Sequence, residues 1–215
     1  MSTSAPIGMK LFLLHRCPFA HRATFVLQEK GLSFEPIFFE QGKRPPELEA
    51  LGPYAKSPTL IDGDTSVWDS QIVIEYLEDR YPDPPLLPSD AARRAEIRML
   101  GARAAQELAS KLGTVVVERL YKSQPDEAKI TEAKREFIQA LDAWDQQLEN
   151  RAFLVGDALS LADVTLYTIF PAMLRQADIG IPEHRKHLRA WHDRMAARPS
   201  SRLLEPITSA SPQRS

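Results

Sequence analysis

A proline-rich segment divides this sequence into two parts with different patterns. Residues 82–88 read Pro-Asp-Pro-Pro-Leu-Leu-Pro, and their prolines fix φ and remove backbone donors, which excludes regular structure there. Before this segment, strand-like runs alternate with helically spaced ones, whereas strand signals are scarce after it. We therefore expect an α/β domain in residues 1–81, a linker in residues 82–89, and an all-helical domain with a polar tail in residues 90–215.

The first domain is predicted to open with a strand, a helix and a second strand. Residues 11–14 form an apolar run, and residues 34–39 are rich in aromatic and branched side chains, as strands are. Between them, residues 19–30 have helical spacing and precede Gly31, a typical C-cap. This order implies a right-handed crossover and a parallel pair of strands. The expected buried face of the helix consists of Phe19, Ala23, Val26 and Leu27.

A hairpin and a closing helix are expected to complete the first domain. The turn sequence Asp62-Gly63-Asp64 separates two short strand-like runs, residues 59–61 and 67–68. Residues 70–81 then return to helical spacing. The apolar positions predicted for the buried face of that helix are Ile72, Val73, Tyr76 and Leu77.

The second domain is predicted to be helical throughout. Helical spacing extends over residues 90–122, 126–150, 161–178 and 183–197. Ser160 and Asp163 have the spacing of a capping box before an apolar run, so a structural role is favoured over a catalytic one for this aspartate. Trp144 and Trp191 occupy helical positions and are expected in the core.

Cys17 is the only cysteine in the chain, and it lies between the first strand and the first helix. At a helix N-terminus, unpaired N–H groups and the macrodipole favour the thiolate, and Arg16 and Arg22 add positive charge, so we expect a reactive thiol with a lowered pKa. The alternative is an inert, buried cysteine. A two-cysteine redox motif would have its second cysteine at position 20, where this chain has Ala20. Thiol exchange at Cys17 therefore needs an external thiol. Glutathione is the obvious candidate, and a single thiol without disulfides fits a reducing compartment.

Composition excludes several other classes of function. The formal net charge is −2, which gives no general attraction to nucleic acid. No apolar segment approaches the roughly 18 residues that span a membrane, and no export signal is evident, so we expect a cytoplasmic protein without a membrane partner. His184 and His187 lack the further ligands of a zinc site, and no glycine-rich phosphate loop is present, so neither a metal nor a nucleotide cofactor is predicted.

Several motifs together resemble the cytosolic glutathione S-transferase superfamily. They are Cys-Pro-Phe-Ala at residues 17–20, Lys-Ser-Pro at 56–58, Asp69-Ser70, the proline-rich linker, and residues 153–163 with their capping box. The resemblance covers nearly the whole chain and is greatest to the cysteine-type members, especially the omega class. It implies a thioredoxin-like domain followed by an all-helical one, glutathione as co-substrate, and a homodimer.

The resemblance also implies a set of glutathione contacts around the thiol. Cys17 matches the catalytic cysteine, and Phe19 the residue beside the sulfur. Ser57, where the family usually has valine, precedes the family's cis-proline, here Pro58, and would bind the cysteinyl backbone of glutathione. From the residues alone, an ordinary trans proline at a strand start remains the alternative.

The two ends of glutathione are assigned to charged and polar groups. Asp69 and Ser70 match the acidic residue and the serine that hold the γ-glutamyl end of glutathione in the family. At the acidic position the omega pattern usually has glutamate. By residue type alone, helix capping and ligand binding remain equally open for this pair. The glycine carboxylate requires a base, for which Lys43, Arg44 and Lys56 are the candidates.

The predicted function is therefore that of a glutathione-dependent thiol transferase or reductase acting through a Cys17–glutathione mixed disulfide. Small disulfides, dehydroascorbate and glutathione conjugates are compatible acceptors. Two alternatives remain: conjugation of glutathione to an electrophile, and a non-catalytic adaptor with the same fold.

Overall fold

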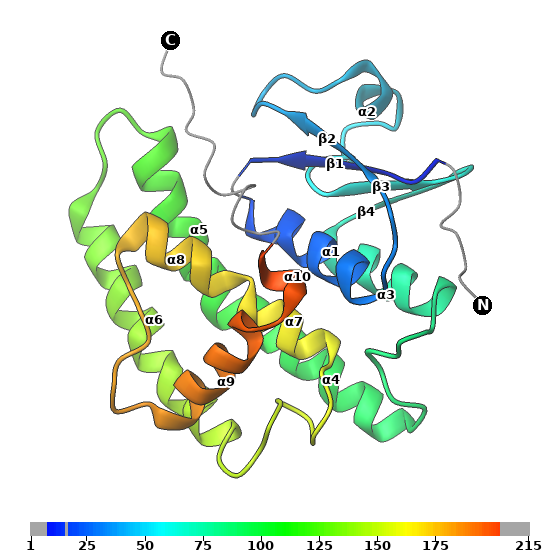
Figure 1. Cartoon of the computed structure of the whole chain (residues 1–215). Helices are drawn as coiled ribbons and strands as arrows, with labels where there is room; N and C mark the ends of the chain where they lie inside the picture. Colours follow the sequence, from blue (N-terminus) through cyan, green and yellow to red (C-terminus); the bar gives the residue numbers. More distant parts are fainter. Residues whose placement is uncertain (1–7, 16, 203–215) are drawn as a thin grey trace. The chain divides into compact units, whose positions relative to one another are not determined.

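The computed structural model describes residues 8–15 and 17–202 (Figure 1). The chain divides into two compact units: unit 1 extends to Pro85 and includes the chain again from Arg198, and unit 2 is Leu86–Ala197. The division falls within the proline-rich segment. The sequence analysis assigned all residues from 90 onward to the helical domain, whereas in the structure the chain from Arg198 belongs to unit 1. The predicted polar tail lies outside the described residues.

Unit 1 is built on a four-stranded sheet with the order β2-β1-β3-β4. β1 (Lys10–Leu14) pairs in parallel with β2 (Glu35–Phe39), which confirms the predicted crossover. On its other side β1 pairs antiparallel with β3 (Thr59–Asp62), and β3 forms the predicted hairpin with β4 (Thr65–Trp68).

Helices cover both faces of this sheet (Figure 1). α1 (Pro18–Glu29) and α3 (Ser70–Arg80) pack together on one face. Because side chains alternate along a strand, Phe12 of β1 points to the opposite face, where it clusters with Leu48 of α2 (Pro46–Ala50). The sequence did not predict α2, since five residues are too few to establish a helical period.

Two of the predicted helix faces differ from the structure in detail. Ala23, Val26 and Leu27 of α1 are buried as expected, but Phe19 is 39% exposed. On α3 the buried apolar residues are Val73, Ile74 and Leu77, whereas Ile72 is 57% exposed and Tyr76 is only partly buried. The buried face of α3 is set by its contacts with α1 and the hairpin, so hydrophobicity alone assigned Ile72 to the wrong side.

Two acidic side chains tie distant segments of unit 1 together. Glu78 pairs with the fully buried Lys30 ammonium at 2.6 Å, and this ammonium also donates to the carbonyls of residues 81 and 84. Glu29, at the end of α1, accepts two hydrogen bonds of 2.7 Å from Arg198 and one from Ser200 of α10 (Pro199–Arg202). The end of the described chain is thereby fastened to the first helix.

Unit 2 is helical, and its elements match the predicted stretches. The first stretch is continuous and contains two π-helical turns; the third is interrupted at Thr168, which separates two helices. In chain order the elements are α4 (Ala91–Ala104), η1 (Ala105–Ala109), α5 (Ser110–Val116), η2 (Val117–Tyr121), α6 (Glu127–Gln147), α7 (Leu161–Tyr167), α8 (Ile169–Ala177) and α9 (Lys186–Ala196).

Aromatic side chains fill the core of unit 2. Trp144 and Trp191 are fully buried, as predicted. The ring of Phe170 packs edge-on against Phe137 and Trp191, with centroid distances of 6.0 and 6.1 Å. Such edge-to-face packing adds to the stability that burial of the rings provides.

The carboxylate of Asp163 joins three segments within this core. The predicted capping box is present: Asp163 accepts hydrogen bonds from the backbone N–H and the hydroxyl of Ser160, at 2.9 and 2.6 Å. It also accepts from the Leu154 N–H and from Nε1 of Trp191, both at 2.9 Å. The structural interpretation of Asp163 is therefore confirmed, and its role extends beyond capping α7.

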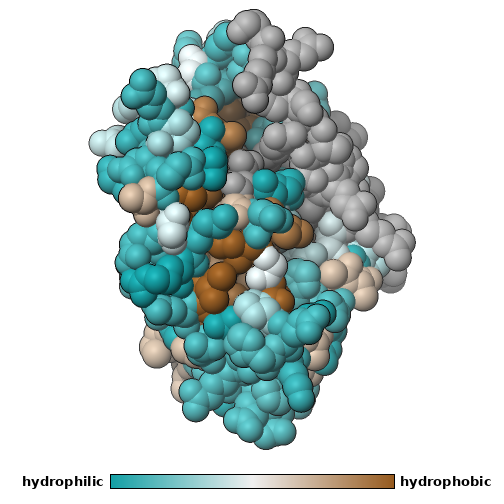
Figure 2. Space-filling view, turned by 90° about the vertical axis from the view of Figure 1, so that its left-hand side faces the viewer, coloured by the Kyte–Doolittle hydropathy of each residue, from teal (hydrophilic) through white to brown (hydrophobic). Residues whose placement is uncertain are grey.

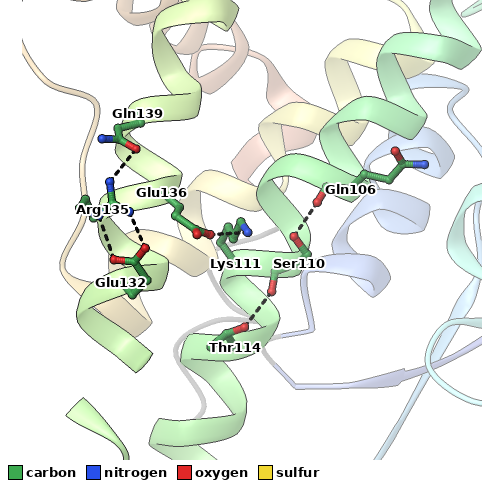
Figure 3. A network of polar contacts seen from close by, with 8 residues as sticks. All are labelled: Gln106, Ser110, Lys111, Thr114, Glu132, Arg135, Glu136 and Gln139. Atoms are coloured by element: carbon green, nitrogen blue, oxygen red, sulfur yellow. Dashed lines mark hydrogen bonds and ion pairs between the residues drawn. The ribbon is translucent and has the colours of Figure 1, made fainter. Parts of the chain in front are cut away.

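Polar contacts join the neighbouring helices α5 and α6. Lys111 of α5 pairs with Glu136 of α6, and further polar contacts run along each of these helices (Figure 3). The face shown in Figure 2 is mainly hydrophilic, with hydrophobic residues gathered near its middle. Among the described residues, no helix has both the length and the apolar character needed to cross a membrane.

Candidate functional site

Cys17 lies at the junction between β1 and α1, as the sequence predicted. It is the N-cap residue of α1, with extended backbone geometry, and Pro18 begins the helix. The Cys17 N–H donates to the Leu14 carbonyl at 3.4 Å, and the Cys17 carbonyl accepts from the His21 N–H at 3.1 Å. The residue is partly exposed. This junction therefore fixes the position of the thiol at the start of α1.

Several donors surround the Cys17 sulfur, but its pKa is not lowered. Burial raises the pKa of the thiol and outweighs the hydrogen bonds from the Ala20 N–H, the Ser57 hydroxyl and the Phe19 N–H, as well as the charge of Arg22, all of which favour the anion. The prediction of a lowered pKa was therefore wrong. The donors at the helix terminus can be read from sequence, whereas burial of the sulfur depends on the tertiary packing around it.

Arg22 is the main site residue that the sequence analysis undervalued. Its side chain is buried, and Nη1 donates to the Ser70 hydroxyl at 2.9 Å. Burial lowers the pKa of Arg22 to about 10, against the attraction of Asp69 and Cys17. Its guanidinium carbon lies 5.6 Å from the centre of the Phe19 ring. Arg22 thus connects the thiol with the N-terminus of α3. Its position early in the first helix, between one and two turns after Cys17, was the sequence feature that could have identified it.

Asp69 and Ser70 begin α3, as predicted. Asp69 is the N-cap residue, and its carboxylate accepts from the Gln71 N–H at 2.9 Å. Its φ of 72° lies in the left-handed region, which is uncommon for a residue other than glycine. The Ser70 hydroxyl accepts from Arg22, which leaves its proton available for a further acceptor. Capping is therefore present, and it leaves both side chains with unused hydrogen-bonding capacity.

The Ser57–Pro58 peptide bond is cis. Ser57 is partly buried and precedes β3. Its hydroxyl oxygen accepts from the Leu14 N–H at 2.9 Å, and the carbonyl of the same Leu14 accepts the Cys17 N–H. Ser57 and Cys17 are therefore joined through Leu14, which the sequence motif alone did not establish.

The three predicted base candidates have different surroundings. The Lys43 ammonium is exposed and pairs with Glu40 at 2.7 Å. Arg44 donates to the carbonyls of Leu48 and Gly52, so its guanidinium holds the C-terminal end of α2. Lys56 is exposed, and within residues 8–15 and 17–202 its ammonium has no ion pair. Lys56 also immediately precedes Ser57, which makes it the best placed of the three.

Contacts therefore unite one part of the predicted site. Ser57 and Cys17 are both hydrogen-bonded to Leu14, and the Arg22 guanidinium lies by the Phe19 ring and donates to Ser70. Lys43 and Arg44 are engaged elsewhere. The described part of the chain contains no group of three or more His, Cys, Asp or Glu residues that could hold a metal ion. Arg16, predicted to add charge beside the thiol, lies outside the described residues.

Family models match most of the chain. Residues 11–85 match the model described as "Glutathione S-transferase, N-terminal domain", and residues 104–199 match "Glutathione S-transferase, C-terminal domain". These matched ranges lie on either side of the proline-rich segment.

Individual relatives are similar over most of their length. Glutathione S-transferase F10 of Arabidopsis thaliana is 30% identical over 82% of this chain and 87% of its own. A stringent starvation protein A homolog of Histophilus somni is 29% identical over 80% of this chain and 77% of its own. The crystal structure of a glutathione S-transferase from Rhodospirillum rubrum F11 has a TM-score of 0.82 and 29% identity, and covers 96% of this chain and 95% of that one. None of these three names refers to the omega class.

Proposed function

Since the chain belongs to the glutathione S-transferase family, we propose that it is a glutathione-dependent enzyme in which Cys17 exchanges thiols through a mixed disulfide with glutathione. The observation that carries this proposal is the position of Cys17 as the N-cap residue of α1, where the start of the helix and the nearby charge of Arg22 favour the thiolate. A thiol in this position can carry negative charge during exchange, and an inert core cysteine needs neither of these influences.

The proposed reaction proceeds in two exchanges. The Cys17 thiolate attacks the glutathione sulfur of a glutathionylated acceptor; the acceptor–glutathione bond breaks, a Cys17–glutathione disulfide forms, and the acceptor leaves as a thiolate that takes up a proton. The thiolate of a second glutathione then attacks the glutathione sulfur bound to Cys17. This step releases oxidised glutathione and regenerates the Cys17 thiolate, so that the acceptor thiol is reduced and one glutathione thiol is oxidised in exchange.

Glutathione is proposed to lie along the N-terminal ends of α1 and α3. The backbone of Ser57 would pair with its cysteinyl residue, and Asp69 and Ser70 would hold the ammonium and carboxylate of the γ-glutamyl end. Lys56 is the proposed partner of the glycine carboxylate, because Lys43 and Arg44 have other partners. Each of these groups is polar, and together they match the charges of the tripeptide.

Oxidised glutathione provides the direct test of the mixed disulfide. We expect native mass spectrometry to show one glutathione on each chain, located at Cys17, because no second cysteine is present to expel it. Cys17→Ser is the control and should carry none. Absence of the adduct from the wild-type protein, when iodoacetamide still reaches Cys17, would contradict the proposal.

The same spectra measure the proposed homodimer. Tyr54 and Trp68 stack with their ring centres 5.7 Å apart, although 68% and 43% of these residues are exposed. Ile72 adds a further exposed apolar side chain, and exposed apolar groups of this size favour contact with a partner. We therefore expect a dimer that carries two glutathiones; a monomer that binds glutathione normally would contradict the dimer alone.

Asp69→Ala separates ligand binding from capping. We expect the affinity for glutathione to fall by at least about tenfold, because the carboxylate would pair with the ligand ammonium in a charge-assisted contact worth about 1.5–3 kcal/mol. Isothermal titration calorimetry and the thermal midpoint should be measured on the same preparation. Asp90→Ala, which removes the N-cap of α4, is the matched control. A loss of about 1 kcal/mol in stability with unchanged affinity would leave Asp69 as a cap only.

Conjugation of glutathione to an electrophile is the second candidate function. It is favoured by the raised pKa of Cys17, since a protonated thiol could donate to the sulfur of a bound glutathione instead of attacking a disulfide. Unit 2 exposes large apolar side chains that an electrophilic acceptor could contact, among them Met99 of α4 and Leu174 of α8.

The thiol-exchange proposal also includes an omega-like class and a cytoplasmic location. Regeneration of Cys17 needs reduced glutathione, which a reducing compartment supplies.

A further inference from the structure

Arg22 carries a buried positive charge that no carboxylate of the described residues pairs with directly. The residue is 2% exposed, and burial lowers the pKa of Arg22 to about 10, which leaves the guanidinium charged at neutral pH. Nη1 donates to the Ser70 hydroxyl at 2.9 Å, whereas Nε is buried without a hydrogen-bond partner. Because an unpaired buried charge is destabilising, an anion that binds close to Arg22 would be stabilised by it.

Ser70, the partner of Arg22, has a hydroxyl proton that is not donated to any of the described residues. Ser70 is 5% exposed and is the first residue of α3. A serine hydroxyl has one proton and two lone pairs, whereas an arginine can only donate. The bond from Arg22 therefore occupies a lone pair and leaves the hydroxyl proton for another acceptor. Since buried donors are normally hydrogen-bonded, this proton points to an acceptor that a ligand supplies.

The bond between Arg22 and Ser70 lies at the N-terminus of α3, where an anion is favoured. The first N–H groups of an α-helix have no acceptor within the helix, and the macrodipole makes this end positive. α1 and α3 pack together, which brings Arg22 to the first residue of α3. The Phe19 ring, 5.6 Å from the guanidinium carbon, gives the cation a further contact. A carboxylate that accepts the Ser70 proton would therefore also lie close to a fixed positive charge.

We propose that Arg22 is a positioning and specificity-determining residue, which fixes the Ser70 hydroxyl as a donor to the α-carboxylate of the γ-glutamyl residue of bound glutathione. This inference rests on the glutathione-dependent function proposed above and gives a role to a residue that is not itself a proposed contact of the ligand. The Arg22 N–H holds the hydroxyl oxygen, and the charge stabilises the carboxylate that accepts the hydroxyl proton. A neutral acceptor would gain nothing from that charge, so the site selects a carboxylate.

The test compares two ligands that differ only at this group. They are glutathione and the analogue in which a carboxamide replaces the α-carboxylate of the γ-glutamyl residue. Isothermal titration calorimetry gives the ratio of their dissociation constants. For the wild-type protein we expect glutathione to bind at least about tenfold more tightly, because hydrogen bonds to charged groups are the stronger ones. Arg22→Met should lower this ratio to about threefold or less, mainly by weakening the binding of glutathione.

Ser70→Ala examines whether Arg22 acts through the serine hydroxyl. This substitution alone should lower the ratio, because it removes the donor that Arg22 orients. Two residues that act as one unit are not additive, so Arg22→Met and Ser70→Ala together should reduce the ratio by less than the product of their separate effects. Independent effects that multiply would overturn the positioning role.

Thr24→Val is the matched control for disturbance of α1. The Thr24 hydroxyl is buried two residues beyond Arg22 and donates to the Ala20 carbonyl at 3.0 Å, so its loss should leave the ratio at the wild-type value. If Arg22→Met does not fold, Arg22→Lys keeps a cation but loses the planar fork that reaches Ser70, and the ratio should then fall by at least about threefold.

The outcomes distinguish this inference from the function on which it rests. If folded Arg22→Met binds both ligands more weakly by the same factor, Arg22 has a structural role only and the inference is overturned, although glutathione binding stands. Equal binding of the two ligands by the wild-type protein overturns it as well. A reduced ratio in Arg22→Met without a glutathione adduct on Cys17 supports the role of Arg22 and counts against thiol exchange. If the wild-type protein binds neither ligand, the proposed function fails and this inference fails with it.

Discussion

Cys17→Ser is expected to abolish thiol transfer from a glutathionylated peptide to glutathione, with a loss of at least about a thousandfold in single-turnover rate. Losses of this size follow removal of a catalytic nucleophile, and a serine hydroxyl cannot form the mixed disulfide. Because Cys17 is the only thiol in the chain, any exchange that remains belongs to glutathione itself. Release of the reduced peptide, followed by mass spectrometry, gives the rate.

The same variant separates the two candidate functions. Conjugation of glutathione to an aryl halide should survive in Cys17→Ser, because a serine hydroxyl at this N-cap can still donate to the glutathione sulfur. If peptide reduction persists at the wild-type rate, thiol exchange through Cys17 is excluded. If both activities disappear while glutathione still binds, Cys17 serves each of them.

Asp163→Ala is expected to have the largest effect on stability, about 3–5 kcal/mol in the free energy of unfolding. The change leaves four buried donors without their acceptor: two from Ser160, one from Leu154 and one from Trp191. A buried donor that loses its partner costs about 1–3 kcal/mol, and relaxation around the alanine recovers part of the sum. Urea unfolding followed by circular dichroism measures the loss.

Asp126→Ala provides the matched control for this measurement. Asp126 is the N-cap of α6 and accepts from the N–H groups of Ala128 and Lys129 in an exposed setting. Its removal should cost about 1 kcal/mol. Equal losses in the two variants would show that Asp163 acts only as a cap and that its contacts with Leu154 and Trp191 add nothing.

Local chemistry explains which structural features the sequence could predict. The turn Asp62-Gly63-Asp64 determined the hairpin, and Gly31, with a φ of 62°, ends α1 as its residue type indicates. The capping box of Ser160 and Asp163 was recognisable because both residues lie within one turn of helix. In each case a few neighbouring residues decide the backbone conformation, so no tertiary contact has to be known.

The features that were missed depend on contacts between distant residues. Arg22 was recognisable as a nearby charge, but its burial and its bond to Ser70 require α1 and α3 to pack together. Arg44 was one of three candidates for the base that binds the glycine carboxylate, and its contacts with the carbonyls of Leu48 and Gly52 were not predictable from the motif. The direction of the Cys17 pKa belongs to the same class, since burial outweighs the local donors that the motif supplies.

The fastening of Glu29 to Arg198 and Ser200 has a consequence for synthesis of the chain. Domains generally fold from the N-terminus as the ribosome releases them, but the partners of Glu29 are made more than 160 residues later. When the sheet and its helices have left the ribosome, this largely buried carboxylate still lacks the arginine that neutralises it. Unit 1 therefore acquires its last contacts only after unit 2 has been translated, so that the first part of the protein to emerge is among the last to be completed.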